Sequence, residues 1–354
     1  MPSAASTRAA LLDQCARYPR LTAQDLLKFL HQSVFGCGHL VEGDSGALDA
    51  LRAEAAQCRD AQGVEVLDGP FCRVHLGVLR EGLAPETLWR AFVLSAAMPC
   101  PAAEDLEGKL SVLLALAQEG ALPVSAEEAE AAVRCWRAEG FPMQRHSEPF
   151  RAAYAPAYRV VHRDFAALLP LLTAIDRKMA QGKAVIAAID GGSAAGKTTA
   201  AALLRQLYGC PVLHMDDFFL RPQQRTAQRL AEDGGNVDRE RFLEEVLAPL
   251  RAGKVAAYRR YDCHTQAVLP AVEVAPAPLI VVEGAYSCHP DLRGCYDLTC
   301  FLRISPDAQR SRIRQRNTPG LQQRFFNEWI PLEQRYFDCF RIPQTCDIIL
   351  EAEP

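Results

Sequence analysis

From residue 184 onward, short runs of consecutive apolar residues alternate with longer stretches in which apolar residues recur every three or four positions. Short apolar runs between glycine, proline or polar residues are typical of buried strands, and the wider spacing is typical of helices. The pattern predicts strands at 184–190, 211–215, 278–283, 297–302 and 346–350, and helices at 198–208, 239–252, 306–316 and 320–340. Regular alternation of strand and helix predicts an α/β fold, a parallel sheet with helices on both faces.

The first 160 residues carry mostly the helical spacing. It predicts helices over 21–35, 47–58, 85–97, 103–119 and 126–139. Residues 63–79 alternate only weakly, which leaves a strand pair, a helix or a loop open there, and 268–278, rich in Pro, Ala and Val, is expected to be a loop. Residues 162–181 form an amphipathic run that ends before Gly182. We therefore expect a mainly α-helical domain over 1–160, a connector helix over 161–181 and the α/β domain over 182–354.

Composition narrows the class of protein without naming an activity. A chain of 354 residues is long enough for two hydrophobic cores. The net charge of −4, with both signs interspersed, argues against nucleic acid and anionic membranes as partners and favours small molecules. The 13 cysteines are scattered and form no Cys-x-x-Cys pair. No apolar run is long enough to span a bilayer, so we expect a cytoplasmic protein with reduced thiols. The oligomeric state stays open.

The strand at 184–190 leads directly into a phosphate-binding sequence. Residues 191–199 read Gly-Gly-Ser-Ala-Ala-Gly-Lys-Thr-Thr, which contains the complete P-loop pattern between a strand and a helix. Glycines allow backbone N–H groups to face phosphates, Lys197 reaches the β and γ phosphate oxygens, and the Thr198 hydroxyl can bind Mg²⁺. A glycine-rich turn that matches by chance is the weaker alternative. The predicted nucleotide-binding residues are Gly191, Gly192, Ser193, Ala194, Ala195, Gly196, Lys197, Thr198 and Thr199.

Acidic residues follow two other predicted strands. Asp216 and Asp217 come after 211–215, and Glu283 ends 278–283. Ligands of such sheets bind beyond the carboxyl ends of the strands, so these carboxylates should meet the P-loop in one crevice. We predict that Asp216 is a general base for a substrate hydroxyl and that Glu283 reaches Mg²⁺. Asp217 is more simply explained as a helix or turn cap, and Glu283 could also be a solvated strand-end carboxylate or an N-cap.

Arginines recur along the predicted helix at 306–316. Arg310, Arg312, Arg314 and Arg316 lie in it, and Arg324 follows. Such a run is usually a solvated helix face. In a phosphoryl-transfer enzyme it can instead form a lid that brings cations to the phosphates. The spacing does not decide between these two readings.

Five segments in order carry a family resemblance. Besides 191–199, they are Asp-Asp-Phe-Phe at 216–219, Asn-Val-Asp at 236–238, Tyr-Asp-Cys-His-Thr at 261–265 and Val-Glu-Gly at 282–284. Over residues 182–350 the chain resembles the uridine kinase and phosphoribulokinase group of P-loop kinases. The resemblance implies ATP- and Mg²⁺-dependent phosphorylation of a primary hydroxyl. In it, Asp216 matches the catalytic aspartate and Glu283 the metal-linked acid.

The same resemblance implies a substrate pocket. Asp238 matches an aspartate that holds ribose hydroxyls, Tyr261 matches an aromatic of the nucleoside pocket, and Phe219 is assigned with them. On its own, Asp238 would also serve as an N-cap, and Tyr261 as a core aromatic. Gln266 stands where uridine kinases have a base-reading histidine, and the arginine-rich lid is shortened before residue 317. The resemblance implies that the acceptor is a nucleoside or a nucleoside-like alcohol. A sugar phosphate or a pantothenate-like acceptor is one alternative. A nucleotide-gated regulatory protein is another.

Polar motifs in the first domain have no assigned role. They are His31 through His39, Cys72-Arg73-Val74-His75, and Arg145-His146-Ser147-Glu148 followed by Tyr154, Tyr158 and Arg159. The histidines and Glu148 could form a metal site or an acid–base centre, although hydrogen-bonded structural histidines are the commoner case. The tyrosines and Arg159 could contact the other domain or a substrate. A separate lyase or hydrolase activity in residues 1–160 is a further alternative.

Overall fold

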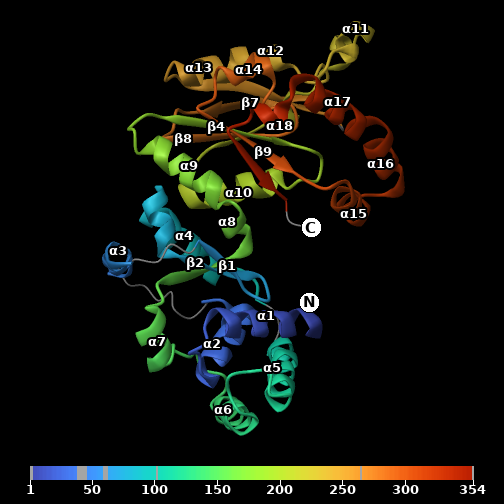
Figure 1. The fold of residues 1–354 in the computed structure, drawn as a ribbon. Helices are drawn as coiled ribbons and strands as arrows, with labels where there is room; N and C mark the ends of the chain where they lie inside the picture. Colours follow the sequence, from blue (N-terminus) through green and yellow to red (C-terminus); the bar gives the residue numbers. More distant parts are fainter. Residues whose placement is uncertain (1–2, 38–45, 59–62, 101–102, 264, 353–354) are drawn as a thin grey trace. The chain divides into compact units, whose positions relative to one another are not determined.

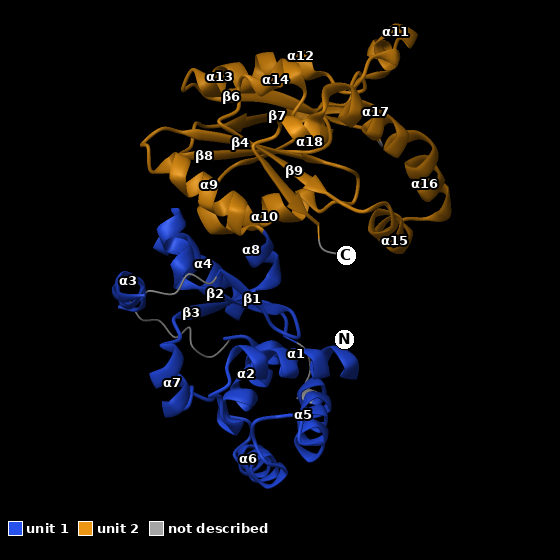
Figure 2. Cartoon of the chain, in the orientation of Figure 1, with its two compact units in different colours: residues 1–167 blue, residues 168–354 orange. Residues whose placement is uncertain are grey.

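The chain divides into two compact units, residues 1–167 and 168–354, in a computed structural model (Figure 2). The structure describes residues 3–37, 46–58, 63–100, 103–263 and 265–352. Within these ranges no helix has both the length and the apolar character needed to cross a membrane. The 13 cysteines are all free thiols.

Unit 1 combines helices with a small sheet (Figure 1). Its helices are α1 (Ala4–Arg17), α2 (Ala23–Phe35), α3 (Ala47–Gln57), α4 (Pro85–Ala96), α5 (Ala103–Gln118), α6 (Ala126–Ala138), α7 (Glu148–Tyr154) and α8 (Arg163–Ala167). Strands β1 (Val64–Val66), β2 (Phe71–His75) and β3 (Tyr158–His162) form an antiparallel sheet in the order β1-β2-β3. Five of these helices, α2 to α6, confirm the predicted ranges to within two residues. The weakly alternating stretch at 63–79 contains the strand pair that was one of its three options.

The segment expected to be one connector helix over 161–181 is not a single helix. Its first residues belong to β3, which pairs with β2, and two helices follow, α8 in unit 1 and α9 (Leu169–Met179) in unit 2. Val160 and Val161 are β-branched and buried, and such residues pack well in a sheet. They therefore favour a strand where the helix was expected to begin. Pro170 lies in the first turn of α9, where its missing N–H is harmless, and it prevents α8 from continuing.

Unit 2 is built on a five-stranded parallel sheet in the order β10-β9-β4-β8-β5. The strands are β4 (Val185–Gly191), β5 (Val212–His214), β8 (Leu279–Glu283), β9 (Leu298–Arg303) and β10 (Ile348–Glu351). All residues of β4 and β8 are buried, which explains their uninterrupted apolar runs. Helix α9 and helix α10 (Lys197–Tyr208) cover one face in Figure 1. The other face packs on α12 (Arg239–Phe242), α13 (Ala248–Arg251), α14 (Pro290–Arg293), α17 (Ile330–Phe340) and α18 (Ile342–Thr345). The α/β fold predicted from the alternation is confirmed.

Two of the predicted helices are interrupted by a π turn, which is wider than a turn of α-helix. The range 239–252 consists of α12, a π turn at Leu243–Leu247 and α13, and 320–340 consists of α16 (Pro319–Arg324), a π turn at Phe325–Trp329 and α17. Each π turn is followed within two residues by a proline, Pro249 or Pro331. A proline removes the N–H that would bond four residues back, and the helix accommodates this by widening locally.

Residues 268–278 are not the loop that composition predicted. Most of them lie in β7 (Ala267–Val274), which forms a two-stranded antiparallel ribbon with β6 (Ala256–Asp262). The register shifts between Arg259 and Tyr261, where two residues of β7, Leu269 and Pro270, face the single residue Arg260 of β6, so Pro270 lies in a β-bulge. A proline is tolerated at such an irregularity because no ladder hydrogen bond is required of it. Since most side chains of β7 are exposed, its sequence lacks the apolar signal of a core strand.

Candidate active site

The P-loop lies between the central strand β4 and helix α10. Gly191 has φ 148°, and a Cβ there would come within 2.4 Å of the Leu302 carbonyl oxygen on neighbouring β9. Gly196 has φ 98° at the N-cap of α10, and Ala194 also has a positive φ of 63°. Glycine is needed at 191 because both the backbone conformation and the close strand exclude a side chain. The predicted loop thus has the strand–loop–helix setting that its sequence requires.

Lys197 begins α10 and bends back over this loop. Its Nζ donates to the carbonyl oxygens of Gly191 at 2.8 Å and Gly192 at 2.9 Å. The first turn of α10 also carries Thr198, so the ammonium and the hydroxyl lie at the same helix N-terminus. A helix N-terminus with an added lysine is a favourable site for phosphate groups.

Strand pairing brings Thr198, Glu283 and His214 together. The Thr198 hydroxyl donates to Glu283 at 3.2 Å from Oγ1 to Oε1, and His214 Nδ1 lies 2.6 Å from the same Oε1. Because His214 and Glu283 are register partners in β5 and β8, their side chains leave the sheet at one edge. The hydrogen bond to Glu283 raises the pKa of His214, and burial opposes this rise. Glu283 is buried, which excludes the solvated strand-end alternative. His214 was not predicted, although its position at a strand end beside Asp216 was a usable signal.

Asp216 and Asp217 lie on a 3₁₀ turn at Met215–Phe218 directly after β5. Asp216 is exposed at its surface, yet protein atoms crowd the carboxylate, and this partial desolvation raises its pKa while Lys197 acts in the opposite direction. Asp217 is half-buried, and burial raises its pKa against the effect of Arg260. Its Oδ2 has no hydrogen-bond partner in the described part of the chain.

Two buried carboxylates support the loop from behind, and sequence reasoning missed both. Asp190 accepts hydrogen bonds from the Gly191 N–H at 2.7 Å, the Cys288 N–H at 2.9 Å and the Tyr336 hydroxyl at 2.9 Å. Burial raises the pKa of Asp190 to about 6. Glu333 on α17 accepts from the Ser193 N–H at 2.8 Å and the Ser193 hydroxyl at 2.6 Å. Asp190 ends an apolar strand, which was a signal, whereas Glu333 is 140 residues away from Ser193 and gave none.

The predicted substrate residues lie beside the 3₁₀ turn. Asp238 caps α12 by accepting from the Arg241 N–H at 3.3 Å and also accepts from Gln224 Nε2 at 2.7 Å, so the N-cap alternative is confirmed. A backbone bridge joins half-buried Phe219 to Val237 next to it. Tyr261 on β6 is buried, and its hydroxyl has no partner among the described residues.

The remaining elements of this region are a 3₁₀ turn at Pro222–Gln224 and helix α11 (Ala227–Ala231). Gln266 has a positive φ of 52° in the turn between β6 and β7. His264, two positions before it, lies outside the described residues.

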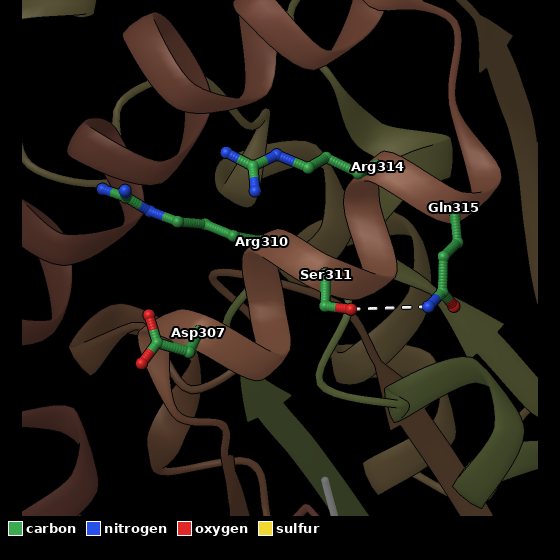
Figure 3. Close-up of a pocket in the computed structure, with 5 residues that line it drawn as sticks. All are labelled: Asp307, Arg310, Ser311, Arg314 and Gln315. Carbon is green, nitrogen blue, oxygen red and sulfur yellow. Dashed lines mark hydrogen bonds between the residues drawn. The ribbon is translucent and has the colours of Figure 1, made fainter.

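The arginines of α15 (Pro306–Arg316) fall into two sets, one that contacts the P-loop and one that lines an open cavity. Arg312 donates to the Ala194 carbonyl at 3.1 Å, and Gln309 donates to the Ser193 carbonyl at 2.8 Å. Arg310 and Arg314 project in one direction from the helix and line an open cavity of about 440 Å³ with Asp307, Ser311 and Gln315 (Figure 3). Arg314, Arg316 and Arg324 each lie within 6 Å of an aromatic ring, those of Phe326, Phe325 and Trp329.

In unit 1 the described residues contain no group of metal-ligating side chains that could hold an ion. His39 lies outside the described residues. Glu148 is exposed and pairs with Arg151, the Tyr154 hydroxyl accepts from the Arg20 N–H, and Arg159 pairs with Glu54. The metal-site alternative therefore finds no support among the described residues.

Comparison with known proteins gives structural neighbours only. No family model and no curated protein matches the chain. A protein described as a possible uridine kinase from Bacillus stearothermophilus is similar over 51% of this chain and 99% of its own, at 21% identity and a TM-score of 0.38. A protein described as a fructose transport system kinase from Silicibacter sp. TM1040 is similar over 47% and 89%, at 20% identity and a TM-score of 0.39. Shikimate kinase from Bacteroides thetaiotaomicron is similar over 48% and 86%, at 18% identity and a TM-score of 0.26. The parallel sheet, together with the loop of residues 191–199 between β4 and α10, gives the second unit a P-loop α/β fold.

Proposed function

We propose that unit 2 is an ATP-dependent kinase that transfers the γ-phosphoryl group to a hydroxyl of a nucleoside-like small molecule. The observation that carries this proposal is the convergence of Lys197, Thr198, Glu283 and Asp216 at one edge of the sheet, from the ends of three strands. Phosphoryl transfer needs positioned cations, a metal and a group that accepts the hydroxyl proton. These four residues provide one candidate for each part.

The donor set at Thr198 and Glu283 fits Mg²⁺. A hydroxyl and a buried carboxylate in hydrogen-bond contact are oxygen ligands of the type that this ion prefers. When bound, Mg²⁺ would neutralise charge on the β and γ phosphates. His214 also contacts the Glu283 carboxylate, at Oε1, and so helps to fix its orientation.

Around the phosphates, the roles of the other residues follow from their positions. The P-loop N–H groups and the Lys197 ammonium stabilise the charge that develops on the γ-phosphoryl group. Asp216 accepts the proton of the attacking hydroxyl. Its raised pKa favours this role because a carboxylate with a higher pKa is a stronger base.

The nucleoside-like acceptor rests on Asp238, Tyr261 and Phe219. Asp238 follows Val237, which bridges to Phe219, so a substrate hydroxyl near Asp216 has a second carboxylate within the same region. The buried Tyr261 hydroxyl is available to a polar ligand atom. Because Gln266 replaces the expected histidine, the base of such a nucleoside is left open, and non-nucleoside alcohols belong in the test.

Mass spectrometry after incubation with ATP and Mg²⁺ tests the proposal. The acceptor panel contains ribonucleosides, deoxynucleosides, modified nucleosides, pantothenate and simple sugars. We expect a monophosphate product with the wild type and a loss of turnover of at least about 100-fold in Asp216→Asn, with ATP affinity nearly unchanged. Asp217→Asn is the matched control and should retain turnover. Wild-type turnover in Asp216→Asn would overturn the general-base assignment, and ATP binding without any product would favour a regulatory role.

A further inference from the structure

A set of charged and polar side chains lies between α2 and the sheet of unit 1. On α2, Asp25, Lys28 and Gln32 are three and four residues apart and therefore share one helix face. On the sheet, Glu65 and Tyr158 are register partners of Arg73 and His75 on β2, which places all four on one face. An amphipathic helix normally turns apolar residues toward a sheet. This interface instead contains charged groups, most of them buried.

Two of these groups, Asp25 and Tyr158, are joined through His146 in a chain of hydrogen bonds. His146, just before α7, places Nδ1 at 2.9 Å from Asp25 Oδ1 and Nε2 at 2.6 Å from the Tyr158 hydroxyl. Ser147 donates its N–H and hydroxyl to the same Asp25 carboxylate at 3.0 and 2.6 Å, which fixes its orientation. Since a carboxylate only accepts, His146 carries its proton on Nδ1, and Nε2 accepts from Tyr158.

The protonation states agree with this assignment. Burial lowers the pKa of His146 to about 4, so the imidazole is neutral near pH 7. Burial also raises the pKa of Tyr158, against the effect of Arg73, so its hydroxyl keeps its proton and donates it to His146. Burial works against ionisation of Asp25, but the bonds from His146 and Ser147 outweigh it and hold the pKa of Asp25 below its usual range. A carboxylate, a neutral imidazole and a hydroxyl in this order form the arrangement that activates hydroxyl groups in hydrolases.

One cation, Arg73, adjoins Tyr158. A second, Lys28, interacts electrostatically with Arg73, and its Nζ donates to the Gln144 carbonyl oxygen at 2.8 Å. The Arg73 guanidinium lies 4.9 Å from the centre of the Tyr158 ring and donates through Nε to Gln32 at 2.9 Å and through Nη1 to Glu65 at 3.2 Å. Its Nη2 is buried and has no hydrogen-bond partner among the described residues. Burial and the charge of Arg73 lower the pKa of half-buried Lys28 to about 8. An unpaired buried N–H and two neighbouring cations both carry a free-energy cost that a bound anion would remove.

Stability alone does not explain this interface. A buried ionic network is often no more stabilising than apolar side chains of the same volume. Groups with perturbed pKa values that gather in one place are instead typical of functional sites. Tyr158 keeps part of its surface exposed, unlike Asp25, Arg73 and His146.

We propose that these residues form a second active site, in which Tyr158 exchanges a proton with a small substrate that carries a carboxylate or phosphate group. The anionic group binds to Arg73 and Lys28. The Asp25 and His146 pair positions and activates Tyr158. This site is independent of the P-loop and does not rest on the kinase proposal.

The proton transfer balances within the described groups. As the Tyr158 oxygen takes a proton from the substrate, its own hydroxyl proton moves to His146 Nε2, and the Asp25 carboxylate stabilises the imidazolium. One proton has then passed from the substrate to His146 without a free phenolate. The reverse sequence returns it to the product.

Labelling of the full chain with an aryl sulfonyl fluoride tests the activated hydroxyl. The Tyr158 oxygen forms a bond to sulfur, fluoride leaves, and the hydroxyl proton goes to His146. Tyr154 is a matched internal control, because it is half-buried in the same unit but accepts only a backbone N–H from Arg20. We expect mass spectrometry to find Tyr158 labelled at least about tenfold faster than Tyr154. Equal rates in the wild type would overturn the proposal without the use of any variant.

His146→Asn tests the positioning role. The ratio of Tyr158 to Tyr154 labelling should fall to about one while Tyr154 itself keeps its wild-type rate. A purely structural role for His146 predicts either an unchanged ratio or, if the variant unfolds, a rise in both rates. An unchanged ratio in a folded variant would overturn the relay.

Protection from labelling tests the anion site. Millimolar inorganic phosphate and millimolar acetate are separate probes, and slowing by phosphate alone or by acetate alone identifies the anionic group of the substrate. Phosphate bound at the P-loop does not register, because the readout is local to Tyr158. Lys28→Met should weaken protection about tenfold, measured as the ratio of labelling rates with and without the anion in the same variant. If neither anion slows labelling, the assigned substrate class is wrong and the proposal fails.

Discussion

A carboxylate and a phosphate group would compete for the same donors at Ser193. The Ser193 N–H and hydroxyl both donate to Glu333, and these groups belong to the loop that the sequence assigns to a triphosphate. Burial raises the pKa of Glu333, whereas Lys197 and the Ser193 donors lower it. When ionised, Glu333 places a negative charge at the proposed phosphate site, and this charge opposes any phosphate that approaches Ser193.

Glu333→Gln should therefore tighten ATP binding by about tenfold, equivalent to about 1.4 kcal/mol, because it removes a like charge while keeping a hydrogen-bond acceptor for Ser193. Isothermal titration calorimetry with ATP and with AMP measures the effect, which should be larger for ATP. Glu328→Gln, on the exposed side of the preceding turn, is the control and should change neither affinity. Weaker ATP binding in Glu333→Gln would mean that the carboxylate supports the bound state instead.

At the scale of elements, the site depends on how closely strands approach one another. Pairing of β4 with β9 places Gly191 directly beside Leu302, and pairing of β5 with β8 places His214 beside Glu283. The loop therefore keeps its shape only if β4 and β9 keep their spacing. A side chain at residue 191 would disturb the strand pair and the loop together.

Gly191→Ala should lower the free energy of unfolding by about 2 kcal/mol or more, because φ is 148° and the new Cβ would lie 2.4 Å from the Leu302 carbonyl oxygen. Urea unfolding of the full chain measures the loss, and ATP titration should show weaker binding at the same time. Gly209→Ala is the matched control, since Gly209 also has a positive φ, 64°, but no atom would meet its Cβ within 4 Å. That variant should lose about 1 kcal/mol and keep its ATP affinity. A smaller loss at 191 than at 209 would contradict the argument from strand spacing.

At the scale of the whole molecule, each unit contains a buried carboxyl group with a shifted pKa, and the two shifts have opposite signs. In unit 2, burial raises the pKa of Asp190 to about 6, so this group favours folding in its neutral form. In unit 1, burial also disfavours ionised Glu65, but Arg73, His75 and Gln14 outweigh it and lower its pKa to about 2. A lowered pKa contributes stability above the unfolded value of 4.5, and that stability is lost as the pH falls toward 2. For Asp190 the sign is reversed, because stability falls as the pH rises through its raised pKa.

Glu65→Gln should reduce the free energy of unfolding at pH 7 by about 3 kcal/mol, because Arg73 then keeps its buried charge without a carboxylate partner. The same variant should lose less stability than the wild type as the pH falls from 4.5 to 2, since its side chain does not titrate. Calorimetric unfolding across this range, with hydrogen exchange to assign the transition to unit 1, makes the comparison. Glu119→Gln, on an exposed pair with Arg8, is the control and should follow the wild type. Parallel pH profiles of Glu65→Gln and the wild type would refute the assignment.

Much of the fold could be predicted because it depends on local patterns. Apolar runs located the five strands of the parallel sheet, and the loop at 191–199 has the setting that its sequence requires. The ribbon β6–β7 escaped prediction because exposed strands lack an apolar signal. The break in the connector escaped because β3 is a strand only through its pairing with β2.

In unit 2 the sequence by itself determined where the P-loop and the acidic residues at strand ends lie, since both are recognised from neighbouring positions. Only the tertiary structure decided which groups meet across the chain. Glu333 contacts Ser193 from 140 residues away, and Asp25 contacts His146 from 121 residues away. Such contacts arise when elements distant in sequence pack against each other, and no local spacing encodes them. For the same reason, the histidines of unit 1 acquired hydrogen-bond partners only in the folded chain.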